Sequence, residues 1–198
     1  MKKTLLALLV LATLLFSVAC SATTSDNPNI EHSGSGKMAK NLTISDIESV
    51  LELSKANTQT YLTSTNDGYN FSGKFNYLYR NCSYKGRSDT NKNIYEADIT
   101  YKGIETSYLS TKKEVDRIME LLTSQSGEIL HGETAACFPI VDYTQLVKLV
   151  CHNFNKLTSD QILEIIYDNK VLAVDGWEFS CSLDHTNKTV TIHLEKAD

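Results

Sequence analysis

Cysteine is the residue type in this chain with the widest chemistry, and there are five of them. Cys20 closes an apolar N-terminal segment, while Cys82, Cys137, Cys151 and Cys181 lie in the remainder. An even number of cysteines in an exported chain permits two disulfides, and four cysteines allow three connectivities. The alternative is that all four are buried thiols that pack as small hydrophobic side chains.

Two of these cysteines fall on patterns that place them in a core. Cys151 belongs to an apolar stripe with helical spacing, and Cys181 lies on the apolar face of an alternating segment. Because both side chains can point into one core, we predict a disulfide between Cys151 and Cys181. That pairing leaves Cys82 to bond with Cys137.

Cys137 also supports a catalytic hypothesis, in which it is the nucleophile of a small cysteine-dependent hydrolase or thiol enzyme. A nucleophilic thiol needs a base within hydrogen-bond reach, and the candidates are His152 and His193. Cys151 precedes His152 directly, but neighbouring side chains on a helix point about 100° apart and form no dyad. The sequence contains no Cys-x-x-Cys motif, which is the usual signature of zinc or thioredoxin-like chemistry.

The histidines of the body form no metal-binding pattern, since no two are four residues apart and none has a zincin-like partner carboxylate. His193 alternates outward between apolar neighbours, which is typical of a solvated strand position. We therefore expect neither a metal nor a cofactor. The histidines considered are His131, His152, His185 and His193.

Tyrosines are frequent in the segment from Tyr69 to Tyr108, and Tyr61 precedes it closely. A row of exposed tyrosines could stack on sugar rings or on a peptide, because tyrosine offers rigid amphipathic area. Ordinary cross-strand packing is the favoured interpretation, since aromatic residues are good strand formers.

Capping boxes mark the predicted starts of helices. In each box a Thr or Asp is followed three residues later by an acceptor side chain, and apolar residues then recur at helical spacing. The four boxes run from Thr43 to Asp46, Thr111 to Glu114, Asp142 to Gln145 and Thr158 to Gln161.

Between the first two predicted helices, and again near the C-terminus, the period changes to two. Alternating segments cover 74–80, 95–102, 177–183 and 190–194, and polar turn residues fill 85–93 and 184–188. Because the strands are grouped instead of alternating with helices, we predict a single α+β domain over residues 42–198. Its sheet is mostly antiparallel and packs with about four capped helices.

The N-terminus has the order of a secretory signal peptide. A basic start is followed by an apolar run over 5–16 and by the small residues Ser17-Val18-Ala19 before Cys20. The run is too short for a transmembrane helix. Ser-Val-Ala-Cys resembles the lipobox of bacterial lipoproteins, although Ser17 stands where the family usually has an aliphatic residue. The resemblance implies removal of residues 1–19 and attachment of fatty acyl chains, such as palmitate, at Cys20.

Residues 20–41 form the predicted lipidated N-terminus and a flexible linker, because almost nothing in them is apolar. The whole chain carries 19 Lys and Arg against 24 Asp and Glu, a formal charge of −5. An acidic body without a basic cluster excludes nucleic acid as an expected partner.

These features favour a membrane-anchored lipoprotein at the cell surface or in the periplasm. Its predicted role is that of a non-enzymatic binding or interaction module, with an extracytoplasmic ligand or protein as partner and the membrane engaged through the lipid. Two alternatives stay open. One is the thiol enzyme centred on Cys137, and the other is an inhibitor or immunity-like module.

Overall fold

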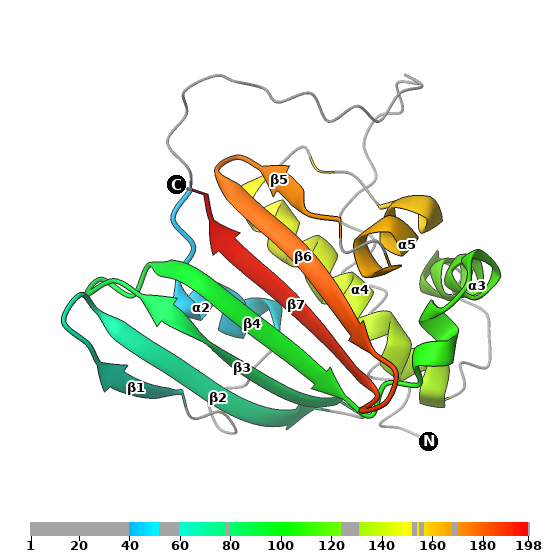
Figure 1. The fold of residues 1–198 in the computed structure, drawn as a ribbon, viewed down its shortest axis with the longest axis horizontal. Coiled ribbons are helices and arrows are strands. Elements are labelled where there is room, and N and C mark those ends of the chain that lie inside the picture. Colours follow the sequence, from blue (N-terminus) through cyan, green and yellow to red (C-terminus); the bar gives the residue numbers. More distant parts are fainter. Residues whose placement is uncertain are drawn as a thin grey trace.

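One sheet of seven strands organises the chain, and every neighbouring pair of strands in it is antiparallel. The computed structural model describes residues 40–51, 60–77, 80–123, 131–151, 154, 157–167 and 170–197. The order across the sheet is β1-β2-β3-β4-β7-β6-β5, so the last strand of the chain lies between β4 and β6 (Figure 1). The strands are β1 Tyr61–Ser64, β2 Tyr69–Tyr77, β3 Arg80–Ser88, β4 Ile94–Lys102, β5 Leu172–Val174, β6 Trp177–Asp184 and β7 Thr189–Lys196.

The described helices cover one face of this sheet, and none of them lies over the other face. In Figure 1, α2 and α4 lie behind the strands, α5 lies to the right beside β6, and α3 packs against α5 farther to the right. The described helices are α2 Ile44–Val50, η1 Thr106–Leu109 (a short 3-10 helix), α3 Lys112–Thr123, α4 His131–Val150 and α5 Ser159–Tyr167. The predicted α+β class, with a mostly antiparallel sheet packed by helices, is confirmed.

The core lies between the sheet and the helices, and alternate side chains along the strands point into it. Ile99, Phe179, Ile192 and Leu194 all point to the helical side and are fully buried. Tyr95 breaks the predicted alternation and is 42% exposed. A register shift at the β3–β4 pair leaves this residue without a partner, which turns its side chain outward.

Two of the predicted capping boxes are complete. Thr43 Oγ1 accepts from the Asp46 amide at 3.2 Å, and Asp46 Oδ2 accepts from the Thr43 amide at 2.7 Å. Thr158 and Gln161 repeat this exchange at 3.2 and 2.9 Å. Thr111 accepts from the amide three residues later at 3.3 Å. These contacts satisfy amide groups that a helix cannot pair internally, which is why the local sequence located these helix starts.

The predicted helix start at Asp142 is wrong. Helix α4 begins at His131 and contains both Pro139 and Asp142. The Asp142 side chain is 3% exposed and accepts a hydrogen bond from the Tyr101 hydroxyl of β4. The Asp142 carboxylate, which the local pattern assigned to a helix cap, is therefore hydrogen-bonded to a residue of a distant strand.

The predicted polar turn over 85–93 is also too long, because β3 continues to Ser88. Lys85 and Arg87 are strand residues that point away from the helices. Gly86 between them has no side chain, so the segment lacks the apolar residue that would have revealed a strand alternation. The turn itself is shorter, and Asp89 Oδ1 accepts from the Asn91 and Asn93 amides at 2.8 Å each.

The first described residues are already attached to the domain. The indole of Trp177 donates to the Lys40 carbonyl at 2.9 Å, and the Lys40 ammonium donates to the Leu149 carbonyl at 2.7 Å. Lys196 reaches the Asn41 side chain at 3.2 Å. The packed body therefore includes Lys40 and Asn41, two residues before the predicted boundary at 42.

Candidate functional site

Polar side chains cover the face of the sheet opposite the helices, which we call the open face. Residues directly paired in an antiparallel sheet point to the same side, so the register defines rows across the strands. One row consists of Ser72, Lys85, Asp98, His193 and Ser180. The neighbouring row consists of Asn70, Arg87, Glu96, Glu195 and Glu178.

The cations of β3 pair with the acids of β4. Arg87 donates to both carboxylate oxygens of Glu96, through Nε at 2.6 Å and Nη2 at 3.1 Å. The Lys85 ammonium lies 3.4 Å from Asp98 Oδ2. Because both cations are well exposed, these pairs contribute little to stability. Their effect at the site is to balance charge: each positive group in this part of the open face has an adjacent negative group.

His193 joins this network from β7. Its Nδ1 lies 2.7 Å from Asp98 Oδ1, and its Nε2 lies 3.6 Å from Glu195 Oε2. Partial burial lowers the pKa of the imidazole, but the hydrogen bond and charge of Asp98, with those of Glu195, outweigh it and raise the pKa above its usual value. The sequence-based expectation of an outward position is confirmed, while the expectation of simple solvation misses the two carboxylates beside the ring.

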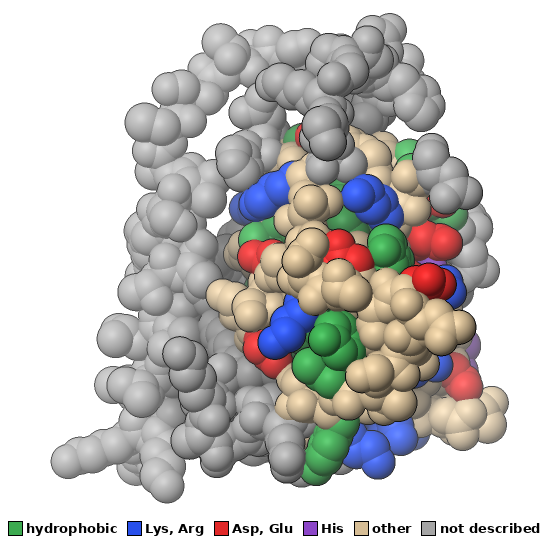
Figure 2. All heavy atoms as spheres, turned by 90° about the vertical axis from the view of Figure 1, so that its left-hand side faces the viewer, with side chains coloured by type: hydrophobic (Ala, Val, Ile, Leu, Met, Phe, Trp, Pro, Cys, Tyr) green, Lys and Arg blue, Asp and Glu red, His purple; other side chains and the backbone are tan. Residues whose placement is uncertain are grey.

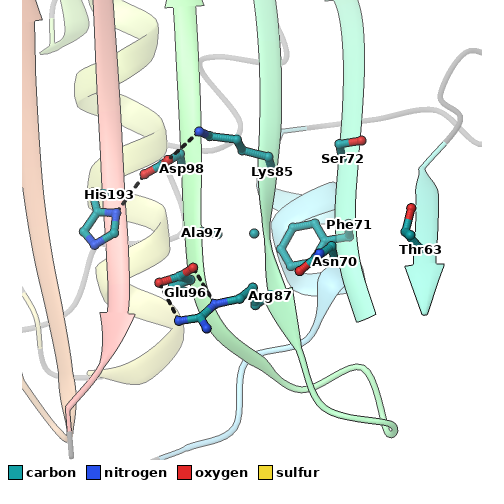
Figure 3. Close-up of a pocket in the computed structure, with 11 residues that line it drawn as sticks. Thr63, Asn70, Phe71, Ser72, Lys85, Arg87, Glu96, Ala97, Asp98 and His193 are labelled. Atoms are coloured by element: carbon teal, nitrogen blue, oxygen red, sulfur yellow. Dashed lines mark hydrogen bonds and ion pairs between the residues drawn. The ribbon is translucent and has the colours of Figure 1, made fainter. Parts of the chain in front are cut away.

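A hollow of about 460 Å³ opens on the open face over β1 to β4 and β7. Figure 3 shows Lys85 and Arg87 extended toward the acids of β4, away from the short side chains of β2. The space over β2 and the adjoining edge of β3 is left uncovered as a result. The residues lining it are Thr63, Asn70, Phe71, Ser72, Lys85, Gly86, Arg87, Glu96, Ala97, Asp98 and His193.

Three uncharged polar side chains line the hollow at the β1–β2 end. Thr63, Asn70 and Ser72 are all exposed. Within the part of the chain that the structure describes, none of the three has a side-chain hydrogen bond to another residue. Two hydroxyls and one amide thus present donors and acceptors to the hollow, while the charged groups beside them are occupied with one another.

Strand β1 forms the rim of the hollow and carries exposed apolar side chains. Tyr61 is 59% exposed and Leu62 is 40% exposed. Tyr61 pairs with Ser72 and therefore lies on the open face, as does Thr63 two residues later. Figure 2 faces this edge and shows hydrophobic side chains beside uncharged polar groups, backbone and Lys or Arg side chains.

The sequence-predicted cysteines lie elsewhere, on the helical side of the sheet or at the end of α4. Cys82, Cys137 and Cys181 are buried and Cys151 is half-buried, and no disulfide joins any two of these four described residues. Burial raises the pKa of Cys181 to about 12, so its reactive thiolate is scarcely populated at neutral pH.

The predicted Cys151–Cys181 bridge does not fit this arrangement. Cys181 lines a small apolar pocket with Pro139, Ile140 and Tyr143 of α4. Cys151 lies eight residues after Tyr143, which on a helix is about 12 Å along the axis. A disulfide needs Cα atoms within about 7 Å of each other. The sequence correctly predicted that the stripe containing Cys151 and the strand face containing Cys181 point toward the core. The two cysteines lie at different heights along the α4 axis, which is why they do not meet.

The catalytic hypothesis for Cys137 gains no support. Its side chain is 2% exposed on α4, between the buried residues Ala136 and Phe138. His193 lies on the opposite face of the sheet, so it does not face this thiol. The other candidate base, His152, lies outside the described residues.

The possible metal ligands and the remaining histidines are the next candidates. Among the described residues no group of three or more His, Cys, Asp or Glu side chains is arranged to hold a metal ion. His185 Nδ1 lies 2.9 Å from the Thr106 hydroxyl, in a contact between the β6–β7 turn and η1. His131 is described in its backbone alone.

Two of the tyrosines that the structure describes lie in the core and not in an exposed row. Tyr84 and Tyr101 are buried under the sheet, and their hydroxyls bond to Thr60 and Asp142. Tyr61 on β1 lies on the open face, and it is not among the residues that line the hollow. The buried central tyrosines agree with the prediction of cross-strand packing, while Tyr61 at the edge is 59% exposed.

The described helices include none that is both long and apolar enough to cross a bilayer. Cys20 and the predicted signal segment lie outside the described residues. No protein family, curated protein or solved structure matches the chain.

Sequence reasoning missed the hollow because it treated outward residues as solvated. The available signal was the alternation of Glu96, Asp98 and Thr100 in β4 with buried residues, which assigns these polar side chains to one face. What the sequence did not contain was the strand order, since β7 reaches β4 only after the helical segment intervenes.

Proposed function

We propose that this chain is a lipid-anchored extracytoplasmic protein whose open face binds a ligand without transforming it. The observation that carries the binding role is the hollow, where uncharged hydrogen-bonding groups stand beside charge pairs on a rigid sheet. Sites built on strands hold their side chains in place more firmly than sites on loops. A sheet with one uncovered face also leaves that surface available to a partner.

A binding module agrees with the chemistry of the side chains. The charged groups of the hollow pair with each other: Arg87 with Glu96, and both Lys85 and His193 with Asp98. The buried thiol of Cys137 offers no comparable support for the alternative of a thiol enzyme. An inhibitor or immunity-like module would use the same open face against a protein.

The lipid anchor rests on the N-terminal sequence. Replacing Cys20 by Ser in the producing cell removes the acylation site, so the variant is expected to leave the detergent phase in a phase-separation assay. The matched control is Cys151→Ser, a change within the body that leaves the signal intact. Equal detergent partitioning of the Cys20→Ser variant and the parent would contradict the anchor.

The binding role is tested with an immobilised panel of defined probes, namely uncharged and charged oligosaccharides and uncharged, acidic and basic peptides. We expect one class to bind the purified domain, and binding to fall when Arg87 is replaced by Ala, since this removes one wall of the hollow. Binding that is unaffected by this change, or no binding to any probe, would contradict the proposed role of the open face. Thermal melts verify that the variant is folded.

A further inference from the structure

Strand β1 forms one edge of the sheet and pairs with β2 alone. All four of its side chains are exposed, and Figure 2 faces this edge. An edge strand carries a row of backbone N–H and C=O groups that can pair with a further strand. Pairing at this edge goes beyond the ligand binding proposed above and does not depend on what the hollow binds.

The hairpin fixes which backbone groups of β1 face outward. Where it closes, the Thr65 amide donates to the Gly68 carbonyl at 2.9 Å. Hydrogen-bonded pairs alternate with non-hydrogen-bonded pairs from there along the ladder, and the pairs that contain Leu62 and Ser64 are of the second kind. The N–H and C=O groups of Leu62 and Ser64 therefore point away from β2. Within the residues that the structure describes, none of these four groups has a hydrogen-bond partner.

The residues of β1 lack the features that usually protect an edge strand, which are charged side chains, proline and bulges. The strand reads Tyr-Leu-Thr-Ser, and its ladder with β2 runs without a register shift. The opposite edge strand differs, because β5 has only three residues and the charged residues Lys170 and Asp175 lie close to its two ends in the sequence. Of the two edges of this sheet, β1 is therefore the one suited to pairing.

A second copy of β1 matches the outward groups of the first. Antiparallel pairing about a twofold axis uses the same donors and acceptors on both chains. With the axis at Leu62, the two copies of Leu62 exchange N–H···O=C bonds, and Ser64 of each copy faces Thr60 of the other. No charged residue lies between Thr60 and Ser64, so the axis brings no like charges together.

The Leu62 side chain adds an apolar contact to this pairing. Leu62 pairs with Phe71 and so lies on the helical side of the sheet, but Phe71 is 2% exposed and Leu62 is 40% exposed. With the axis at Leu62 the two leucines lie directly opposite each other, about 5 Å apart, and each covers the other. We infer that β1 pairs with β1 of a second copy, antiparallel and centred on Leu62. Because four residues bury little area, the expected dissociation constant is about 10–1,000 µM.

Disulfide cross-linking of the full chain tests the register. Leu62→Cys places two thiols at the axis, where Cα atoms about 5.5 Å apart fit a disulfide. Ser64→Cys is the matched control on the same strand and face, because the two copies of this residue lie four positions apart along the pair, about 13 Å. After mild oxidation of membranes from the producing cell, a non-reducing gel should show a dimer for Leu62→Cys. Ser64→Cys should give no more dimer than the parent, whose own cysteines set the background.

Sedimentation equilibrium of the full chain in detergent solution, from about 1 to 500 µM, measures the strength of association. Leu62→Lys places two ammonium groups side by side at the axis and should weaken association at least about tenfold. Val171→Lys is the matched control, since Val171 is 49% exposed and lies next to the opposite edge strand, and it should stay within about twofold of the parent. Each variant is shown by thermal melting to be folded.

A chain that stays monomeric at the highest concentration would overturn the pairing, and so would association that Leu62→Lys leaves unchanged. A dimer of Ser64→Cys in place of Leu62→Cys would overturn the register. Cross-linking of Leu62→Cys to a protein of different mass would overturn the choice of a second copy. These results are distinct from a failure of the ligand-binding function, which appears in the panel of probes.

Discussion

Replacing Gly73 by Ala tests how β2, the strand that carries Asn70 and Ser72, is held over the core. A methyl group at Gly73 would lie 2.3 Å from Cζ and 2.4 Å from the hydroxyl oxygen of Tyr84. The ring is fixed by its hydroxyl, which lies 2.6 Å from Thr60 Oγ1. The methyl and the ring cannot both keep their positions, so β2 or Tyr84 must move.

The cost follows from three contributions. Overpacking a core costs about 1–3 kcal/mol, and losing the Tyr84–Thr60 hydrogen bond costs about 1 kcal/mol more. Alanine also restricts the unfolded chain, which offsets about 0.4–1 kcal/mol. We expect the Gly73→Ala variant to lose about 1–3 kcal/mol of unfolding free energy. In a domain of this size the melting temperature falls by roughly 3–10 °C.

Urea unfolding followed by circular dichroism measures the loss, and two further variants show its origin. Tyr84→Leu removes the two ring carbons and the hydroxyl oxygen that meet the methyl, so Gly73→Ala should cost at least about 1 kcal/mol less in that background. Gly103→Ala is the control: its φ is +71° and no atom lies within 4 Å of the added methyl, so its cost should not depend on Tyr84. A Gly73→Ala variant within about 0.5 kcal/mol of the parent, or no coupling to Tyr84, would refute the close approach.

Three further predictions concern titration, thiols and the N-terminal boundary. The folded-state pKa of His193 is raised, so its contribution to stability is present at acid pH and is lost as the pH rises through that pKa; unfolding free energy measured from pH 5 to 9 should show this fall, and His193→Gln should lack it. Native alkylation should label half-buried Cys151 well before Cys181, a residue that is only 5% exposed, and equal labelling rates followed by mass spectrometry would contradict the burial. Deleting Lys40 with everything before it should lower the unfolding free energy by about 1–2 kcal/mol, because the Trp177 indole loses its carbonyl acceptor; a melt identical to that of a chain beginning at Lys40 would show that water replaces this contact fully.

Local sequence was informative wherever one short segment satisfies its own backbone. The boxes at Thr43 and Thr158 determine helix starts because the cap and its partner are three residues apart and need nothing else. Period-two alternation located β6 and β7 for a similar reason, since burial of one sheet face imposes it on each strand. The same alternation was enough to predict the α+β class.

Distant partners decided the rest. Asp142 has the local pattern of a cap, but Tyr101, which is 41 residues away, makes it a buried acceptor inside α4. The separation between Cys151 and Cys181 depends on how α4 packs across β6, and this packing cannot be read from residue spacing in the sequence.

The hollow shows the division between sequence and tertiary structure most clearly. Alternation in the sequence was sufficient to place Glu96 and Asp98 on one face of a strand, because neighbouring side chains in a strand point to opposite sides. The meeting of Asp98 with Lys85 and His193 depends instead on the order β3-β4-β7, in which residues 95 positions apart in the chain become direct neighbours. Strand order is set by the packing of the whole sheet against its helices, and that is a property of the folded chain and not of any segment in it.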